Sequence, residues 1–158
     1  MINNLTNINQ FDFRFKECIL SHDSTIIDNG IKELVDSINS IEEFCTINSC
    51  QGFLIKKERY DHAPITYVDF YVLYHNYNMA FNLFRILTHK IGSLINCTVN
   101  YEADQDYIDD DYVEDNGLIN MRFRIEIYEP NESYMTCLEL YKKIINEINS
   151  FKEEIISK

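Results

Sequence analysis

The chain has 158 residues, of which 46% are hydrophobic, and this is enough for one folded domain with a core of its own. Its 26 acidic residues outnumber its 14 basic ones, and the formal net charge of −12 disfavours binding to phosphate backbones unless basic residues gather on one face. No run approaches the roughly 20 apolar residues that cross a bilayer. The N-terminus lacks the pattern of a signal peptide, so we expect a cytoplasmic protein without membrane contact.

The first 44 residues predict an N-terminal extension followed by an amphipathic helix. The extension covers residues 1–22, and its alternating phenylalanines indicate either a short edge strand or the start of a helical turn. The helix is predicted over residues 25–44, because apolar residues recur there at the spacing of one buried stripe. Ser24 is a suitable N-cap, since its hydroxyl can accept a hydrogen bond from an unpaired helical N–H.

Four strands and two further helices are predicted in the rest of the chain. In chain order they are strand 45–50, strand 65–75, helix 77–94, strand 96–103, strand 118–128 and helix 130–158. The last strand alternates apolar and polar residues, as a strand does when one face is buried and the other is wet. Pro130 suits the first turn of the final helix, where a missing N–H costs nothing. We therefore expect an α+β fold, with an antiparallel sheet and helices packed mainly on one of its faces.

The order helix–strand–strand occurs twice, which suggests a duplicated α-β-β unit within a single domain of residues 1–158. The two units, residues 24–75 and 76–128, have nearly equal length. Cys45-Thr-Ile-Asn48 and Cys97-Thr-Val-Asn100 fall at equivalent places in them. Cys50 has no cysteine counterpart in the second unit, so it is the more unusual thiol.

An acidic segment separates the last two predicted strands. Residues 102–115 hold eight acidic residues and no basic one. The segment fails the EF-hand pattern, because no oxygen ligand stands at the fifth position of either Asp-rich run. We expect a solvated hairpin tip that turns at Asn116-Gly117, with weak cation binding as the alternative.

A small polar cluster, Ser49-Cys50-Gln51-Gly52, ends the first predicted strand. Glycine lets the backbone approach a ligand closely or adopt a positive φ, and the three other side chains donate or accept hydrogen bonds. Either a ligand-contacting pocket edge or a strand that ends at a turn with a buried thiol fits this pattern. Cys50 would act as a nucleophile only if a nearby histidine or cation lowered its pKa.

Basic residues and histidines stand near this cluster in the sequence. Arg14 and Lys16 precede the first predicted helix, and Lys56, Lys57 and Arg59 follow the cluster. His62 and His75 come after it and are candidates to face the same pocket, with ordinary surface or packing roles as the alternative. The five cysteines lack CxxC spacing, which favours reduced thiols over a disulfide framework or a zinc site.

The order of motifs resembles the wybutosine-synthesis methyltransferase family, whose members use S-adenosylmethionine to modify tRNA. The resemblance lies in residues 11–52, and its motifs are Asp23-Ser24 with Ile27-Asp28, Leu34-Val-Asp-Ser-Ile-Asn39 and Phe44-Cys-Thr-Ile-Asn-Ser-Cys-Gln-Gly52. It implies S-adenosylmethionine as cofactor and tRNA as partner. The resemblance implies Asp28, Ser49, Cys50 and Gly52 as pocket residues. Together with Gln51 of the polar cluster, they are the candidate ligand-binding residues.

The chain departs from this family in two ways. Phe53 stands where the family has an arginine, which removes a guanidinium able to meet phosphate or carboxylate, and the net charge of −12 contrasts with a basic surface. Three hypotheses follow. The protein is a tRNA-modifying methyltransferase, or a non-catalytic relative that binds a small metabolite or protein partner, or an acidic protein that blocks nucleic-acid partners through residues 102–115.

Overall fold

The computed structural model describes residues 13–21, 27–52, 65–109 and 112–157. Their elements in chain order are α1 (Phe13–Ser21), α2 (Lys32–Asn39), β1 (Phe44–Cys50), β2 (Thr66–Val72), the 3-10 turn η6 (Tyr74–Asn76), α3 (Tyr77–Ile91), the 3-10 turn η7 (Gly92–Leu94), β3 (Ile95–Asp109), β4 (Tyr112–Ile127) and α4 (Cys137–Ile156). Ser24 lies outside the described residues.

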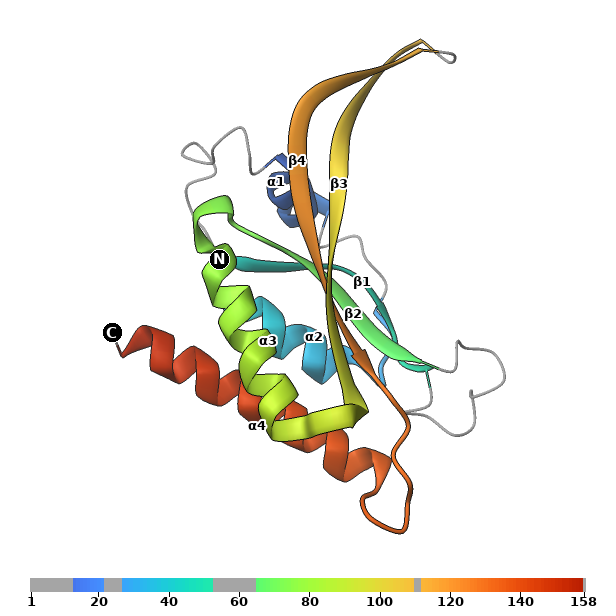
Figure 1. Ribbon diagram of the computed structural model, residues 1–158, viewed down its shortest axis with the longest axis vertical. Helices are drawn as coiled ribbons and strands as arrows, with labels where there is room; N and C mark the ends of the chain where they lie inside the picture. Colours follow the sequence, from blue (N-terminus) through green and yellow to red (C-terminus); the bar gives the residue numbers. More distant parts are fainter. Residues whose placement is uncertain (1–12, 22–26, 53–64, 110–111, 158) are drawn as a thin grey trace.

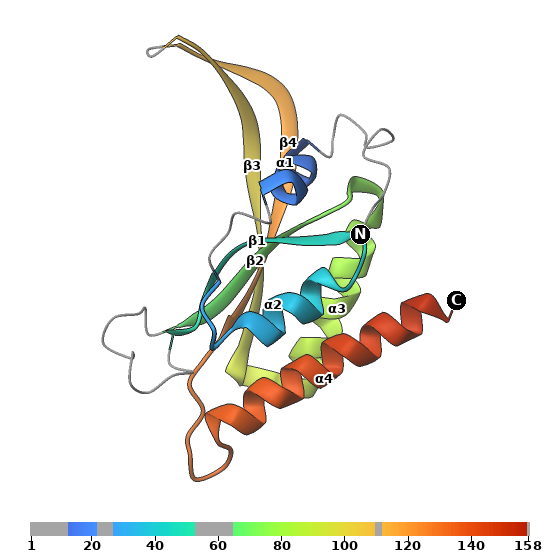
Figure 2. The ribbon, with the colours of Figure 1, turned by 180° about the vertical axis from the view of Figure 1, so that it is seen from behind.

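The strands form one antiparallel sheet in the order β1-β2-β4-β3, with β2 and β4 at its centre. Helices α2, α3 and α4 lie on one face of this sheet, and the short α1 lies on the other (Figures 1 and 2). The predicted α+β fold, with helices mainly on one face, is therefore confirmed. Each α-β-β unit contributes one edge strand and one central strand, while the duplication itself stays a prediction.

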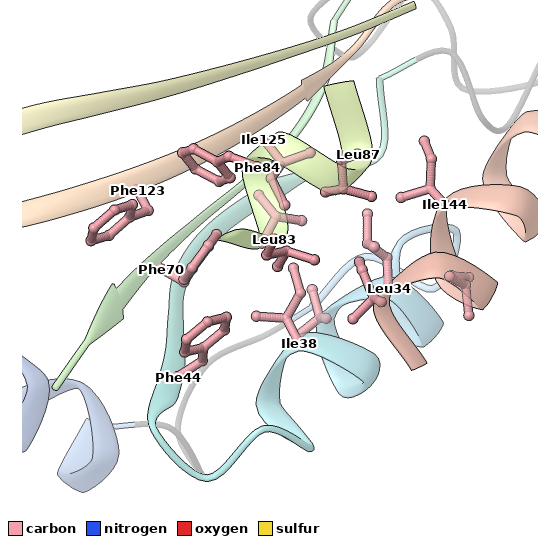
Figure 3. Close-up of a cluster of buried hydrophobic side chains, with 14 of the residues drawn as sticks. Leu34, Ile38, Phe44, Phe70, Leu83, Phe84, Leu87, Phe123, Ile125 and Ile144 are labelled. Atoms are coloured by element: carbon pink, nitrogen blue, oxygen red, sulfur yellow. The ribbon is translucent and has the colours of Figure 1, made fainter. Parts of the chain in front are cut away.

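The main core lies between the sheet and the three helices α2, α3 and α4 (Figure 3). The rings of Phe70 and Phe123 on the two central strands stack with centroids 5.7 Å apart, and Phe84 of α3 meets both edge-on. Each large side chain that is fully buried here stabilises the fold by about 1.5–3 kcal/mol. Because this apolar layer covers one face of the sheet, the opposite face of each strand is the one available for other contacts.

The first predicted helix is wrong at both ends, because α2 covers only Lys32–Asn39. No side chain of the preceding residues caps it, and Ile31 stands at the N-cap position. Instead, the hydroxyl of Tyr141 in α4 accepts a hydrogen bond of 3.0 Å from the backbone N–H of Leu34. A tertiary contact thus satisfies a group that the sequence pattern assigned to a local cap.

The last helix begins at Cys137, so the predicted start near Pro130 is also wrong. Thr136 forms a capping box: its hydroxyl accepts from the N–H of Glu139, and the Glu139 carboxylate accepts from the N–H of Thr136 at 2.8 Å. A Thr-x-x-Glu box satisfies two of the unpaired N–H groups at once. This local signal determines the start of α4 more strongly than Pro130 does.

The predicted turn at Asn116-Gly117 is wrong, because both residues lie inside β4. β3 and β4 stay paired through the acidic segment as far as Asp109 and Tyr112. The register shifts where Asn116 and Gly117 occur, since β3 runs from Ala103 to Gln105 while β4 passes from Ile119 to Asp115. Glycine inside a strand often marks such an irregularity rather than a turn.

The two cysteine motifs that suggested a repeat face opposite sides of the sheet. Cys45 pairs in register with Tyr71 and packs with α1, whereas Cys97 pairs with Ile125 and packs against the main core. The match in sequence therefore does not give the two thiols equivalent surroundings.

Candidate functional site

The predicted residues Asp28 and Gln51 come together at the end of β1, where Gln51 is only 1% exposed. The side-chain carbonyl of Gln51 accepts from the N–H of Gly30 at 3.1 Å, and its backbone N–H donates to the Asp28 carboxylate at 3.5 Å. The Thr66 hydroxyl donates to the backbone carbonyl of Gln51 at 2.7 Å. Gln51 therefore joins the segment before α2, the end of β1 and the start of β2.

Gly52 is required by its own chain at the same junction. Its φ is +50°, and a Cβ there would lie 2.7 Å from the backbone atoms of Ile65 and Thr66. Side chains rarely adopt this backbone conformation, and no real Cβ approaches backbone so closely. The close backbone approach that suggested a ligand is thus made by residues 65–66.

The other two predicted residues, Ser49 and Cys50, are half-buried and lie on opposite faces of β1. Ser49 is opposite Val68, which packs in the main core, and Cys50 is opposite Tyr67 on the face that carries α1. The basic residues that follow the cluster (Lys56, Lys57, Arg59) and His62 lie outside the described residues. Exposed His75 lies in the 3-10 turn η6.

A charged network that sequence reasoning missed occupies the face of the sheet turned away from the main core. The Arg124 guanidinium of β4 binds the Asp69 carboxylate of β2 through two hydrogen bonds of 2.6 and 2.7 Å. Asp69 is fully buried, and the same guanidinium lies over the ring of Tyr67 with 4.4 Å to its centroid. The hydrogen bond to Asp69 is the main reason that the pKa of Arg124 is raised.

A second part of this network lies where the outer half of the β3–β4 pair begins. The Tyr71 hydroxyl of β2 donates to Glu102 of β3 at 2.6 Å, and Glu102 also pairs with Arg122 of β4 at 2.9 Å. Burial, then the hydrogen bond to Glu102, raises the pKa of Tyr71, while the charges of Arg14 in α1 and of Arg122 oppose the rise. These contacts tie three strands together at one level of the sheet.

The alternation of polar and apolar residues in the last predicted strand predicts part of this polar face. It placed Arg122 and Arg124 on the wet side of a strand, and the structure places both on the polar face. It could not show that Asp69, in an otherwise apolar strand, would be the buried partner of Arg124, because that pairing depends on the register of β2 with β4.

Beyond this level β3 and β4 continue as a two-stranded ribbon, defined here as residues 103–109 and 112–119. β2 pairs with β4 only from Thr66 to Tyr71, whereas β3 pairs with β4 out to Asp109 and Tyr112. The ribbon projects well past the helices and the rest of the sheet (Figure 1). It carries most of the acidic segment.

An open pocket of about 290 Å³ lies at another place, between residues 40–43 and the end of α4. Lys152, Ile155 and Ile156 form its α4 side, and it contains none of the predicted site residues. Among the described residues, no group of three or more His, Cys, Asp or Glu side chains is arranged to hold a metal ion. No helix in that part of the chain is long and apolar enough to cross a membrane.

Comparison with known proteins gives no relative from which to transfer a function. No protein-family model, curated protein or solved structure matches the chain.

Proposed function

We propose that this protein binds a basic protein partner along its β3–β4 ribbon. The observation that carries the proposal is the ribbon itself, which leaves the sheet and continues without a third strand from the described part of the chain. The proposal is closest to the second hypothesis from the sequence, a non-catalytic relative that binds a small metabolite or protein partner, and it uses the acidic segment of the third.

The first supporting step is structural. An isolated pair of strands is at best marginally stable in water, because it lacks a hydrophobic face covered by other elements. Among the described residues, each strand of the ribbon pairs only with the other past Arg122, and its outer edges present backbone donors and acceptors. Such edges are templates for pairing with another chain. A partner chain that pairs with one of these edges would add a third strand to the ribbon.

The second step is charge. Residues 102–115 contain eight of the 26 acidic residues of the chain and no basic one. The negative charge of this segment would attract a basic partner and steer it to the ribbon.

The third step is the fixed direction of the ribbon. Tyr71, Glu102 and Arg122 connect β2, β3 and β4 where the ribbon starts. Both contacts are made to the Glu102 carboxylate, and hydrogen bonds and ion pairs to a charged group are stronger than neutral hydrogen bonds. This connection holds the root of the ribbon to the body, so a bound partner lies at a defined place relative to the sheet.

The resemblance to the wybutosine-synthesis methyltransferases supports a competing hypothesis, S-adenosylmethionine-dependent methyl transfer to tRNA. It requires a ligand at the end of β1. There, the polar groups of Gln51 bind residues 28, 30 and 66 of the same chain, and Gly52 packs on residues 65–66. These contacts favour the other interpretation of the cluster, in which it is the end of a strand at a turn and its polar groups bind the same chain.

Isothermal titration with a short Lys- and Arg-rich peptide tests the proposal. A ribbon variant, Asp106→Asn/Asp109→Asn/Glu114→Gln, removes three negative charges, and we expect about tenfold weaker binding from the loss of three partly exposed ion pairs. The matched control, Glu147→Gln/Glu153→Gln/Glu154→Gln, removes the same charge from α4 and should bind like the wild type. An equal loss in both variants would show that only net charge matters and would reject the ribbon as the site.

Two further titrations of the wild-type protein separate the hypotheses. Binding of S-adenosylmethionine, or binding of tRNA with a steep salt dependence, would favour the methyltransferase hypothesis over ours. We expect neither, together with peptide binding that weakens as salt is added.

A further inference from the structure

We propose that Cys18 of α1 and Cys45 of β1 form a dithiol pair that a small-molecule disulfide converts into a protein disulfide, which fixes α1 on the sheet. The inference is independent of the ribbon. All five cysteines of the chain are thiols in the structure.

The two thiols meet in a small core of their own. Cys18 is 4% exposed and Cys45 is 2% exposed, and together with Phe15 they form the centre of the contact between α1 and the sheet. Both sulfur atoms lie against the same backbone oxygen, that of Thr46, at 3.1 Å from Cys18 and 3.9 Å from Cys45. The two thiols are therefore neighbours in this core.

The shape of β1 brings them together. The register of β1 shifts between Thr46 and Asn48, and such bulges change the direction of the strand locally. The side chain of Asn39 bonds both the N–H and the hydroxyl of Thr46 at 2.8 Å, which holds this residue in place while its carbonyl accepts from Cys18. The pairing thus depends on a specific local geometry and not on general proximity.

The reaction is a thiol–disulfide exchange. One cysteine thiolate attacks a sulfur of the oxidised small molecule and forms a mixed disulfide, which releases one thiol. The second cysteine then attacks the protein sulfur of that mixed disulfide and releases a second thiol. Overall, two S–H bonds in the protein are replaced by one S–S bond. The small-molecule disulfide takes up the two electrons and two protons and becomes two molecules of the small thiol.

The surroundings make the reaction slow while α1 stays docked. The neighbouring Cys45 thiol and the burial of Cys18 both raise the pKa of Cys18, so little of the reactive thiolate is present at neutral pH. Reaction therefore proceeds when α1 separates transiently from the sheet. Once formed, the bond joins residues 18 and 45 and removes the states in which α1 is undocked.

The test incubates the native full-length protein with oxidised glutathione and maps its disulfides by mass spectrometry without reduction. We expect a loss of two hydrogen atoms from the intact mass, one dominant linked peptide pair containing Cys18 and Cys45, and a melting temperature raised by roughly 5–10 °C. Reduction should reverse both changes. Cys50→Ser should leave the linkage intact, whereas Cys18→Ser or Cys45→Ser should abolish it.

Two results would overturn the proposal. One is a native protein that forms only mixed disulfides with glutathione, for example at half-buried Cys50. The other is a link between Cys18 and Cys45 that appears only after unfolding, together with other cysteine pairs. The peptide map is made on the wild-type protein. It therefore separates the proposed link between Cys18 and Cys45 from both of these results even if a serine variant fails to fold.

Discussion

At the scale of single residues, Gln51 and Gly52 show how a polar cluster at a strand end can be needed by the chain itself. The side-chain carbonyl, the backbone N–H and the backbone carbonyl of Gln51 each bond another part of the same chain, and Gly52 allows two backbone segments to approach closely. Residue types alone left two interpretations equally open, a ligand-contacting pocket edge and a strand that ends at a turn with a buried thiol. The contacts with residues 28, 30 and 65–66 favour the strand end at a turn.

Replacing Gly52 by alanine tests this role. The alanine would have to adopt a left-handed backbone conformation, and its Cβ would clash with the backbone of Ile65 and Thr66. We therefore expect the free energy of unfolding to fall by at least about 2 kcal/mol. Gly92→Ala is the control, since Gly92 has a φ of +73° but nothing within 4 Å of a Cβ. It should cost only the backbone strain, about 1–2 kcal/mol. Equal losses in urea unfolding would contradict the close approach.

At the scale of elements, α4 starts where its capping box is, and α2 starts where α4 supports it. Thr136 and Glu139 satisfy each other's backbone N–H groups, and Tyr141 supplies the hydroxyl that accepts from the N–H of Leu34 in α2. The start of α2 therefore depends on the docking of α4. A substitution that weakens the start of α4 should therefore destabilise both α4 and α2.

Thr136→Ala removes one half of the capping box. We expect the free energy of unfolding to fall by about 1 kcal/mol, because one helical N–H loses its acceptor. Ser150→Ala is the matched control, since it removes a hydroxyl from an exposed position inside α4 and should leave stability unchanged or slightly higher. Chemical denaturation of both variants measures the difference.

The same box has a pH dependence. Hydrogen bonds from the backbone and side chain of Thr136 lower the pKa of Glu139 in the folded protein. The contribution of its carboxylate is therefore complete above the unfolded pKa of about 4.3, and it is lost as the pH falls through the lower folded pKa. The stability difference between the wild type and Glu139→Gln should narrow in acid.

Periodicity and alternation predicted the elements and their order well, because the faces of α3, α4 and β4 are buried by a single apolar layer. Boundaries failed wherever a contact distant in sequence decided them. The shortened α2 depends on Tyr141, 107 residues away from Leu34. The eight acidic residues of 102–115 predict a solvated hairpin tip there, although β-prone residues stand between them, namely Tyr107, Ile108, Tyr112 and Val113.

The candidate site was predicted less completely than the fold. The cluster at the end of β1 was located in the right place, but its contacts came from segments that no spacing rule connects. The pair of Asp69 and Arg124 depends on the register of two central strands, and the pair of Cys18 and Cys45 depends on a helix docked across the sheet. Both belong to tertiary structure.

At the scale of the whole molecule, the protein has a compact body and a projecting acidic ribbon. The body buries its apolar residues between one face of the sheet and three helices, and it closes part of the other face with α1 and a charged network. The ribbon extends beyond both layers (Figures 1 and 2). Its backbone edges and its charge both suit a basic partner chain.

Backbone hydrogen exchange of the full-length protein, with and without the Lys- and Arg-rich peptide, tests the central claim most directly. In the unbound protein, amides of the ribbon should exchange faster than those of β2 and the inner half of β4, because a two-stranded pair opens more easily. The peptide should slow exchange in residues 103–109 and 112–119 by at least about tenfold, with little change in α4. Slowed exchange at the end of β1 or in α4, with an unchanged ribbon, would contradict the account.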